Sequence, residues 1–233
     1  MRLFRRKQQH HAQDVFDTNL YTVIEEHNID LILDVGANVG QYAQGLFSQG
    51  FKGHIISFEP GKIAHETLSA KAVNHPRWTI APRMALGRKR EMLTLHTFDR
   101  TDMNSLLPPN ENAFKSFPRM TVEGTEEVQV ERLDAILQDI IPKDLPAKHI
   151  LLKTDTQGSE LAVFEGASGC LNQITLLQLE VPVVPVYSNA PVWMDVLLPV
   201  HQSGFQPILT SSGFNKRLKG TIDMDVVFKK SKD

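Results

Sequence analysis

The chain has 233 residues, 41% of them hydrophobic, so it can bury one substantial core, and its composition shows no break that would suggest a second domain. The formal charge of −2 at pH 7 gives no basic footprint and argues against a nucleic-acid partner. One cysteine, Cys170, excludes an internal disulfide, and no apolar run reaches the roughly 18 residues of a membrane helix, so we expect a cytoplasmic protein without stable membrane anchoring.

Residues 1–29 are expected to form a basic tail and a helix. Arg2, Arg5, Arg6 and Lys7 form a short basic cluster, and no apolar run of signal-peptide length follows it. We interpret this cluster as a solvated tail, with transient contact to an anionic membrane or partner as the alternative. Residues 13–28 place apolar side chains near helical spacing, which predicts an amphipathic helix on the sheet edge or over the site. Residues 30–233 are expected to form a single domain.

Residues 31–59 are the stretch around which the domain is organised. Residues 31–35 predict a strand buried on both faces, and the glycines at 36 and 40 predict a tight turn before a helix. Glycines let the backbone approach a ligand, and the first amides of the helix point into the same space. The stretch predicts a nucleotide-sized pocket formed by Gly36, Ala37, Asn38 and Gly40.

Two acidic residues indicate which nucleotide binds. Asp34 lies on the strand just before the turn, where a carboxylate would repel a pyrophosphate and attract an ammonium or sulfonium group. Glu59, followed by Pro60, ends a second predicted strand over residues 54–58, where doubly wound folds place an acid that binds ribose hydroxyls. S-adenosylmethionine satisfies both demands.

The next stretch predicts a crossover helix over residues 61–73 and a third strand region made of residues 78–81 and 84–86. Residues 91–130 predict two short added strands that flank a long loop. Long loops in compact domains are usually functional or disordered, so this one is a candidate lid, carrying Phe114, Phe117 and Met120, or a solvated cover.

The second half of the chain predicts a helix at residues 133–141 and a fourth strand at residues 149–154, next to the first strand. Asp155 stands at the carboxyl end of that strand, where open α/β sheets bind their ligands. Lys153 lies on the same side and is expected either to pair with Asp155 or to act directly. Glu180 ends a fifth strand at residues 174–181. A helix at residues 192–203 and closing strands at residues 205–209 and 224–228 follow.

The order of these segments resembles the FkbM-type family of class I S-adenosylmethionine-dependent methyltransferases. The matching segments are residues 34–40 (DVGANVG), 58–60 (FEP), 85–87 (ALG), 104–106 (NSL), 152–160 (LKTDTQGSE) and 179–180 (LE). The resemblance covers about residues 30–185. It implies a Rossmann-like α/β fold, with a seven-stranded, mostly parallel sheet, an antiparallel last strand and helices on both faces. Backbone contacts of Ala85 and Leu86 to adenine and a role for Ser105 near cofactor or substrate are also implied.

The resemblance implies O-methylation of a small acceptor, a sugar or metabolite hydroxyl. We expect Asp155 to be the general base, with Glu180 second and Lys153 assisting. A divalent metal between Asp155 and Glu180 is the alternative and is not expected, because no histidine motif accompanies the two carboxylates. The rival functions are a catalytically silent binding module and a dinucleotide oxidoreductase, although the G-x-G-x-x-G pattern of the latter is absent.

Overall fold

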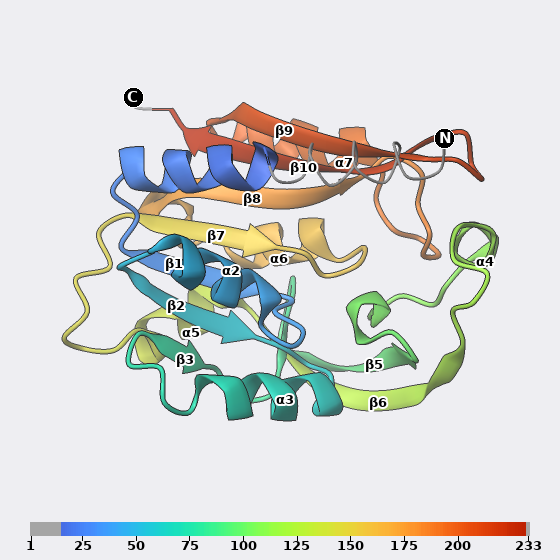
Figure 1. Cartoon of the computed structure of the whole chain (residues 1–233), viewed down its shortest axis with the longest axis horizontal. Coiled ribbons are helices and arrows are strands. Elements are labelled where there is room, and N and C mark those ends of the chain that lie inside the picture. The colour runs from blue at the N-terminus through green and yellow to red at the C-terminus, as the bar shows by residue number, and fades with distance from the viewer. Residues whose placement is uncertain (1–14, 232–233) are drawn as a thin grey trace.

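The computed structural model describes residues 15–231 and shows a seven-stranded sheet with helices on both faces (Figure 1). In spatial order its strands are β3 (Trp78–Ile80), β2 (His54–Phe58), β1 (Leu31–Val35), β7 (Ile150–Thr154), β8 (Ile174–Pro182), β10 (Gly220–Lys230) and β9 (Phe205–Asn215). The first five strands are parallel, and β10 is antiparallel to both of its neighbours. This arrangement confirms the predicted fold class.

The central strands owe their position to mostly apolar sequences, LILDV in β1 and ILLKT in β7. Every residue of β1 and β7 is buried, as expected for parallel strands covered on both faces. Side chains alternate between the faces, so Leu31 and Leu33 join one core cluster while Ile32 joins the other.

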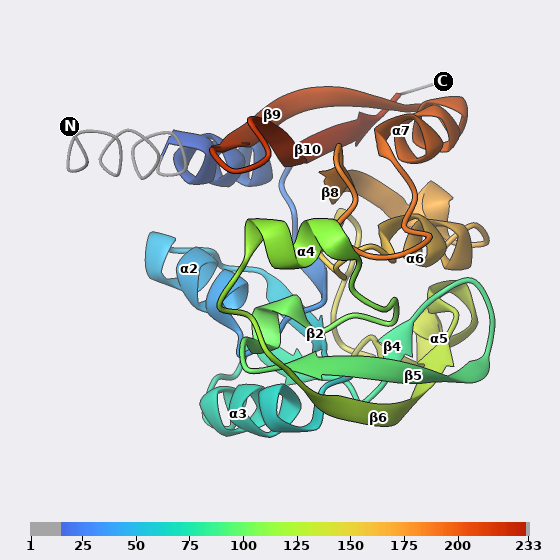
Figure 2. The ribbon, with the colours of Figure 1, turned by 90° about the vertical axis from the view of Figure 1, so that its right-hand side faces the viewer.

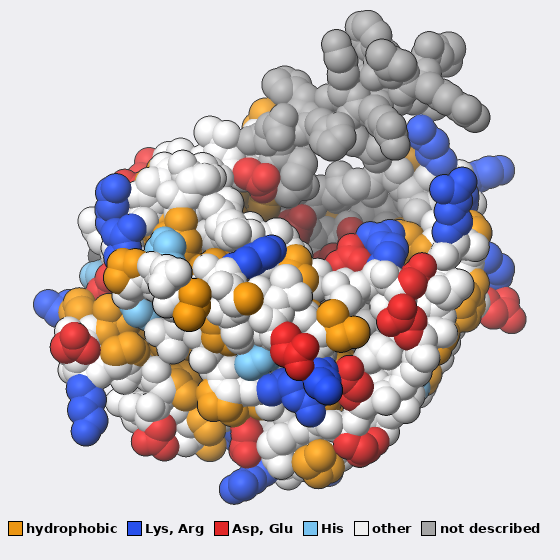
Figure 3. All heavy atoms as spheres, turned by 60° about the horizontal axis from the view of Figure 1, so that its bottom comes forward, with side chains coloured by type: hydrophobic (Ala, Val, Ile, Leu, Met, Phe, Trp, Pro, Cys, Tyr) orange, Lys and Arg blue, Asp and Glu red, His pale blue; other side chains and the backbone are white. Residues whose placement is uncertain are grey.

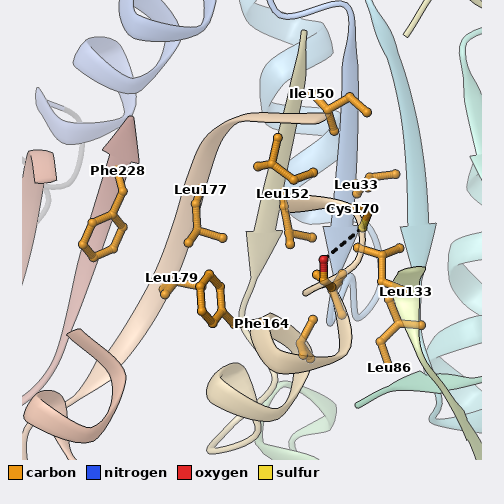
Figure 4. Close-up of a cluster of buried hydrophobic side chains, with 14 of the residues drawn as sticks. Leu33, Leu86, Leu133, Ile150, Leu152, Phe164, Cys170, Leu177, Leu179 and Phe228 are labelled. Carbon is orange, nitrogen blue, oxygen red and sulfur yellow. Dashed lines mark hydrogen bonds between the residues drawn. The ribbon is translucent and has the colours of Figure 1, made fainter. Parts of the chain in front are cut away.

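In the part of the chain that the structure describes, three helices cover each face of the sheet. One core cluster lies between the sheet and α5 (Leu133–Ile140), α6 (Glu160–Gly166) and α7 (Trp193–Gln202). Figure 4 shows Leu33, Leu152 and Leu177 of this cluster on the strands, together with Leu133 and Phe164 from the covering helices. The other cluster lies under α2 (Gln41–Gln49), α3 (Lys62–Ala72) and the helix at residues 15–26.

A second sheet, with strand order β4-β6-β5, is inserted before β7. It contains β4 (Ala85–Leu86), β5 (Glu91–Phe98) and β6 (Val122–Glu131). The expected third strand region was therefore wrong in part, since residues 78–80 belong to the large sheet and residues 85–86 to the small one. Pro82 separates them and has no amide hydrogen with which to continue a ladder. The added strands, at 8 and 10 residues, are also longer than the short strands expected.

Residues 99–121, called the insertion loop below, connect β5 to β6. The loop contains a 3₁₀ turn, η1 (Thr101–Met103), and a short helix, α4 (Glu111–Ser116), which Figure 2 shows above β5 and β6. Met103, Ala113 and Met120 pack with Tyr187 from the segment between β8 and α7. The loop is thus attached to the segment that follows β8 by a small apolar cluster of its own.

The closing strands are longer than expected, because the β9–β10 hairpin extends well beyond the two short closing strands predicted. Helix α6 ends at Gly166, and a separate 3₁₀ turn, η2 (Leu171–Gln173), precedes β8. The basic cluster near the start of the chain lies outside the described residues. Within residues 15–231, no helix combines the length and apolarity needed to cross a membrane.

Candidate active site

A cleft of about 620 Å³ opens at the carboxyl ends of β1, β2 and β7, beneath the insertion loop. This is the edge of a parallel sheet at which α/β proteins bind ligands. Eight of the predicted site residues line the cleft: Gly36, Asn38, Glu59, Pro60, Ala85, Leu86, Ser105 and Asp155.

The turn after β1 depends on its two glycines for different reasons. Gly36 has a φ of +75°, and a Cβ placed there would lie 1.9 Å from the carbonyl oxygen of Asp155. Gly40 has a φ of +85°, and a Cβ there would meet the Trp78 ring at 2.6 Å. Gly36 therefore permits the close approach of the backbone just after β1 to the backbone just after β7. Gly40 instead leaves room for the packing of the Trp78 ring. Neither Gly40 nor Ala37 lines the cleft itself.

Glu59 lies at the end of β2 with its carboxylate held by the backbone. One oxygen accepts the amide of Asn38 at 2.8 Å and the other accepts the amide of Gly61 at 2.7 Å. The side chain is buried, and that burial raises the pKa of Glu59 to about 7 despite the two amides, which favour the charged form. Each oxygen keeps a further lone pair with which to accept a ligand hydroxyl.

Asp34 has a different environment from the one expected. Its carboxylate is fully buried, lies 3.1 Å from the ammonium of Lys153 and accepts a hydrogen bond from the Ser57 hydroxyl at 3.1 Å. It does not line the cleft. Because Lys153 already neutralises it, the carboxylate of Asp34 cannot carry the argument that the ligand is cationic.

Lys153 is clamped between several groups behind the turn. Its ammonium lies 3.1 Å from Asp34 and 3.8 Å from Asp155, and it donates to the carbonyl oxygen of Gly36 at 3.2 Å. The nearby carboxylates raise its pKa, although burial acts in the opposite direction. Its closer acidic partner is Asp34, so the expected pairing with Asp155 is the weaker of its two ion pairs.

The far side of the cleft is apolar. Leu86 and Leu95 are buried beneath it and Met84 is partly buried at its edge. Met84 both lines the cleft and packs on the core. Such a wall suits the face of a planar heterocycle.

The insertion loop is tied to the turns that frame the cleft. The Ser105 hydroxyl donates to the carbonyl oxygen of Gln157 at 2.7 Å, and the Thr101 hydroxyl donates to the side-chain oxygen of Asn38 at 2.8 Å. Asn104 accepts the amide of Phe98 at 3.0 Å and so shapes the loop. These bonds hold the loop over the cleft.

Asp155 and Glu180 come together through Gln157. The side-chain amide of Gln157 donates to one oxygen of Asp155 and one of Glu180, each at 3.0 Å. Burial, followed by repulsion from Asp155, raises the pKa of Glu180 well above its usual value. Asp155 is the more exposed of the two, with 43% of its side chain accessible. The sequence placed both acids correctly at their strand ends but gave no role to Gln157.

A second, polar cavity of about 1040 Å³ adjoins the cleft and shares Asp155 and Gln41 with it. It lies between the helix at residues 15–26, α2 and the sheet, and Lys153, Glu180 and Asp225 also line it. Burial and the neighbouring acids raise the pKa of Asp225 to about 7. No sequence pattern indicated Asp225, because β10 reaches the site only through the fold.

Glu160 is fully buried and braces the loop after β7. It accepts the amides of Thr156 at 2.8 Å and Gly158 at 3.1 Å, and burial raises its pKa. Its carboxylate thus faces its own loop. Within residues 15–231, no group of three or more histidine, cysteine, aspartate or glutamate side chains has an arrangement that could hold a metal ion.

The charge of the surface is mixed on the face shown in Figure 3, where basic and acidic side chains are interspersed. The cleft is not mixed. Among the described residues that line it, Glu59, Asp102 and Asp155 are acidic and none is basic. The cleft therefore disfavours a pyrophosphate and favours a ligand with positive charge.

Comparison with known proteins gives a consistent result. A family model described as the methyltransferase FkbM domain matches residues 34–207. Methyltransferase sdnD from Sordaria araneosa is 25% identical over 172 residues, and the match covers 66% of each chain, just under two thirds of that relative. An O-methyltransferase from Bacillus cereus, solved in complex with SAH, matches in structure with a TM-score of 0.50 at 12% identity, over 92% of this chain and 80% of the other. That likeness concerns the fold.

Proposed function

The chain belongs to the methyltransferase FkbM domain family, and we propose that it transfers the methyl group of S-adenosylmethionine to a hydroxyl group of a small acceptor. A glycosyl or secondary-metabolite hydroxyl is the acceptor class that the sequence resemblance favours. The observation that carries the proposal is the cleft: it has three acidic side chains and no basic one among its described lining, and its carboxylate at the end of β7 borders a polar cavity.

The cleft residues suit S-adenosylmethionine in both shape and chemistry. Glu59 offers two carboxylate oxygens for ribose hydroxyls, and the apolar wall formed by Leu86 and Leu95 suits adenine. Asp155 supplies negative charge for the sulfonium and amino groups, whereas Asp102 is already paired with Arg100 at 2.5 Å. A pyrophosphate, as in NAD, would face Glu59 and Asp155 and meet no basic side chain among the described residues that line the cleft.

The donor, when bound, supplies a methyl group on a positively charged sulfur, and the carbon–sulfur bond breaks as the acceptor oxygen bonds to the carbon. The chain must align the acceptor oxygen and remove its proton. Asp155 is our candidate for this base, because it lines both cavities and lies 3.8 Å from the ammonium of Lys153. Glu180, whose pKa is raised, keeps its proton more readily.

The polar cavity is our candidate for the acceptor site. It begins at Asp155, so an acceptor held there presents its hydroxyl to the base at the border between the two cavities. Its lining of carboxylate, amide and hydroxyl groups, including Gln178 and Tyr42, suits a small hydroxylated molecule. The mixed surface charge and the formal charge of −2 favour such an acceptor over nucleic acid.

A screen with a labelled methyl donor tests the proposal. Purified protein is incubated with the donor and a panel of hydroxylated sugars and polyketide fragments, and label transfer to oxygen is measured. We expect transfer with at least one acceptor and its loss in Asp155→Asn. Donor binding together with transfer to nitrogen or carbon alone would contradict O-methylation, and donor binding without transfer to any acceptor would favour the silent binding module.

A further inference from the structure

We propose that Gln157 is a positioning residue that holds the carboxyl groups of Asp155 and Glu180 in a fixed position relative to each other for methyl transfer. This inference rests on the proposed function, because it assigns a task within the same reaction. Its basis is the hydrogen-bond geometry around one side-chain amide, which joins the ends of β7 and β8.

The amide nitrogen of Gln157 uses both of its hydrogens on the acid pair. It lies 3.0 Å from an oxygen of Asp155 and 3.0 Å from an oxygen of Glu180. A primary amide has two N–H donors on that nitrogen, one for each acid. Two carboxyl groups that would otherwise repel each other are thereby linked through a neutral donor.

Gln157 is itself fixed from both ends. Its backbone adopts a φ of +56°, and its carbonyl oxygen accepts the hydroxyl of Ser105 at 2.7 Å. Its side-chain oxygen lies 3.1 Å from the hydroxyl of Tyr187, which also lies 2.8 Å from the carbonyl oxygen of Met103. The single hydrogen of that hydroxyl is shared between these two acceptors. The insertion loop and the segment after β8 therefore both hold this glutamine.

The surroundings determine which way the amide points. Reversing it would place the amide oxygen against the oxygens of Asp155 and Glu180, which are acceptors when ionised. It would also remove both donors from the acid pair. The observed orientation, with nitrogen toward the acids and oxygen toward Tyr187, is the one that satisfies every group when the pair carries negative charge.

This geometry has an electrostatic consequence for Glu180. Burial and neighbouring acids raise its pKa, whereas an N–H donor favours the ionised form and opposes that rise. The other charged or titratable groups around Glu180 are kept in every variant. They are Lys153 and Asp155 at the end of β7, Glu160 on α6, Asp223 and Asp225 on β10, and Tyr187 after β8.

Two substitutions separate the donor role from a role in packing. Gln157→Met keeps the length of the side chain and removes both donors. Gln157→Asn keeps an amide and suits a left-handed backbone, but it is one methylene too short to span both acids in the same way. Gln173→Met, on an exposed glutamine outside the cavities described here, is the matched control.

The direct readout is the pH titration of the Glu180 carboxyl carbon by NMR, assigned with Glu180→Gln. We expect its midpoint to rise by about half a pH unit or more in Gln157→Met and Gln157→Asn and to stay unchanged in Gln173→Met. Unchanged midpoints in both Gln157 variants would overturn the proposal. This titration needs no acceptor, so it examines Gln157 even where the transferase assignment fails.

The second readout is the pH profile of turnover on a confirmed acceptor. We expect the acidic limb of kcat to move to higher pH in both Gln157 variants, with kcat reduced about tenfold or more and the KM for the methyl donor within about threefold of wild type. An equal loss at every pH with no shift of the limb would indicate a purely structural role and would contradict the proposal.

Discussion

The pKa of Glu59 provides a quantitative test of the cofactor site. If the ionised carboxylate accepts the ribose hydroxyls, donor affinity should follow its ionisation. With a pKa of about 7, roughly nine-tenths of Glu59 is ionised at pH 8 and roughly one-tenth at pH 6. Affinity for S-adenosylhomocysteine, the demethylated product, should therefore fall about tenfold between these pH values, or about 1.4 kcal/mol.

Calorimetric titration from pH 6 to pH 8 measures this effect. Glu59→Gln should bind more weakly at pH 8, by about 1.5 to 3 kcal/mol for each hydrogen bond to the charged group that is lost, and its affinity should not vary with pH. Asp225→Asn is the matched control, since Asp225 also has a pKa of about 7 but lines the polar cavity, and it should keep the tenfold dependence. A pH dependence that survives in Glu59→Gln would refute the reasoning.

Three further substitutions test separate parts of the account. Asp155→Asn should reduce kcat about a hundredfold on a confirmed acceptor while donor affinity changes little, and near wild-type turnover would make Asp155 structural. Lys153→Met leaves the buried carboxylate of Asp34 unpaired and should cost about 3 to 5 kcal/mol in the free energy of unfolding; the double variant with Asp34→Asn should recover part of this loss, and a Tm equal to wild type in Lys153→Met would contradict the pairing. Gly36→Ala should lose most folded protein or donor binding because its Cβ would overlap the Asp155 carbonyl, whereas Gly45→Ala, with open space around it, should raise or maintain the Tm.

The sheet and the first turn could be predicted because their signals are local. Leu31–Val35 and His54–Phe58 are mostly apolar runs, and glycines at both ends of α2 mark where it begins and ends. Asp155 could be placed because it directly follows a buried strand, and Glu180 because it lies near the carboxyl end of another, and parallel strands end at one edge of a sheet.

The remaining site depends on contacts between distant segments. The closer acidic partner of Lys153 follows from the register of β1 on β7, which sets Asp34 directly opposite Lys153. The sequence suggested Asp155 instead, which is only two residues away along the chain. Gln157 stands inside the most recognisable segment, yet its two acidic acceptors come from separate strands. The insertion loop carried an apolar signal, Phe117 and Met120, but its contact with Tyr187 appears only in the folded chain.

The central claim is that the cleft binds a sulfonium cofactor and not a dinucleotide. Calorimetry of the purified chain at pH 8, with S-adenosylmethionine and NAD titrated in parallel, tests it most directly. The cleft chemistry predicts micromolar affinity for S-adenosylmethionine, about −8 kcal/mol, and no measurable binding of NAD. Binding of NAD with none of S-adenosylmethionine would contradict the account.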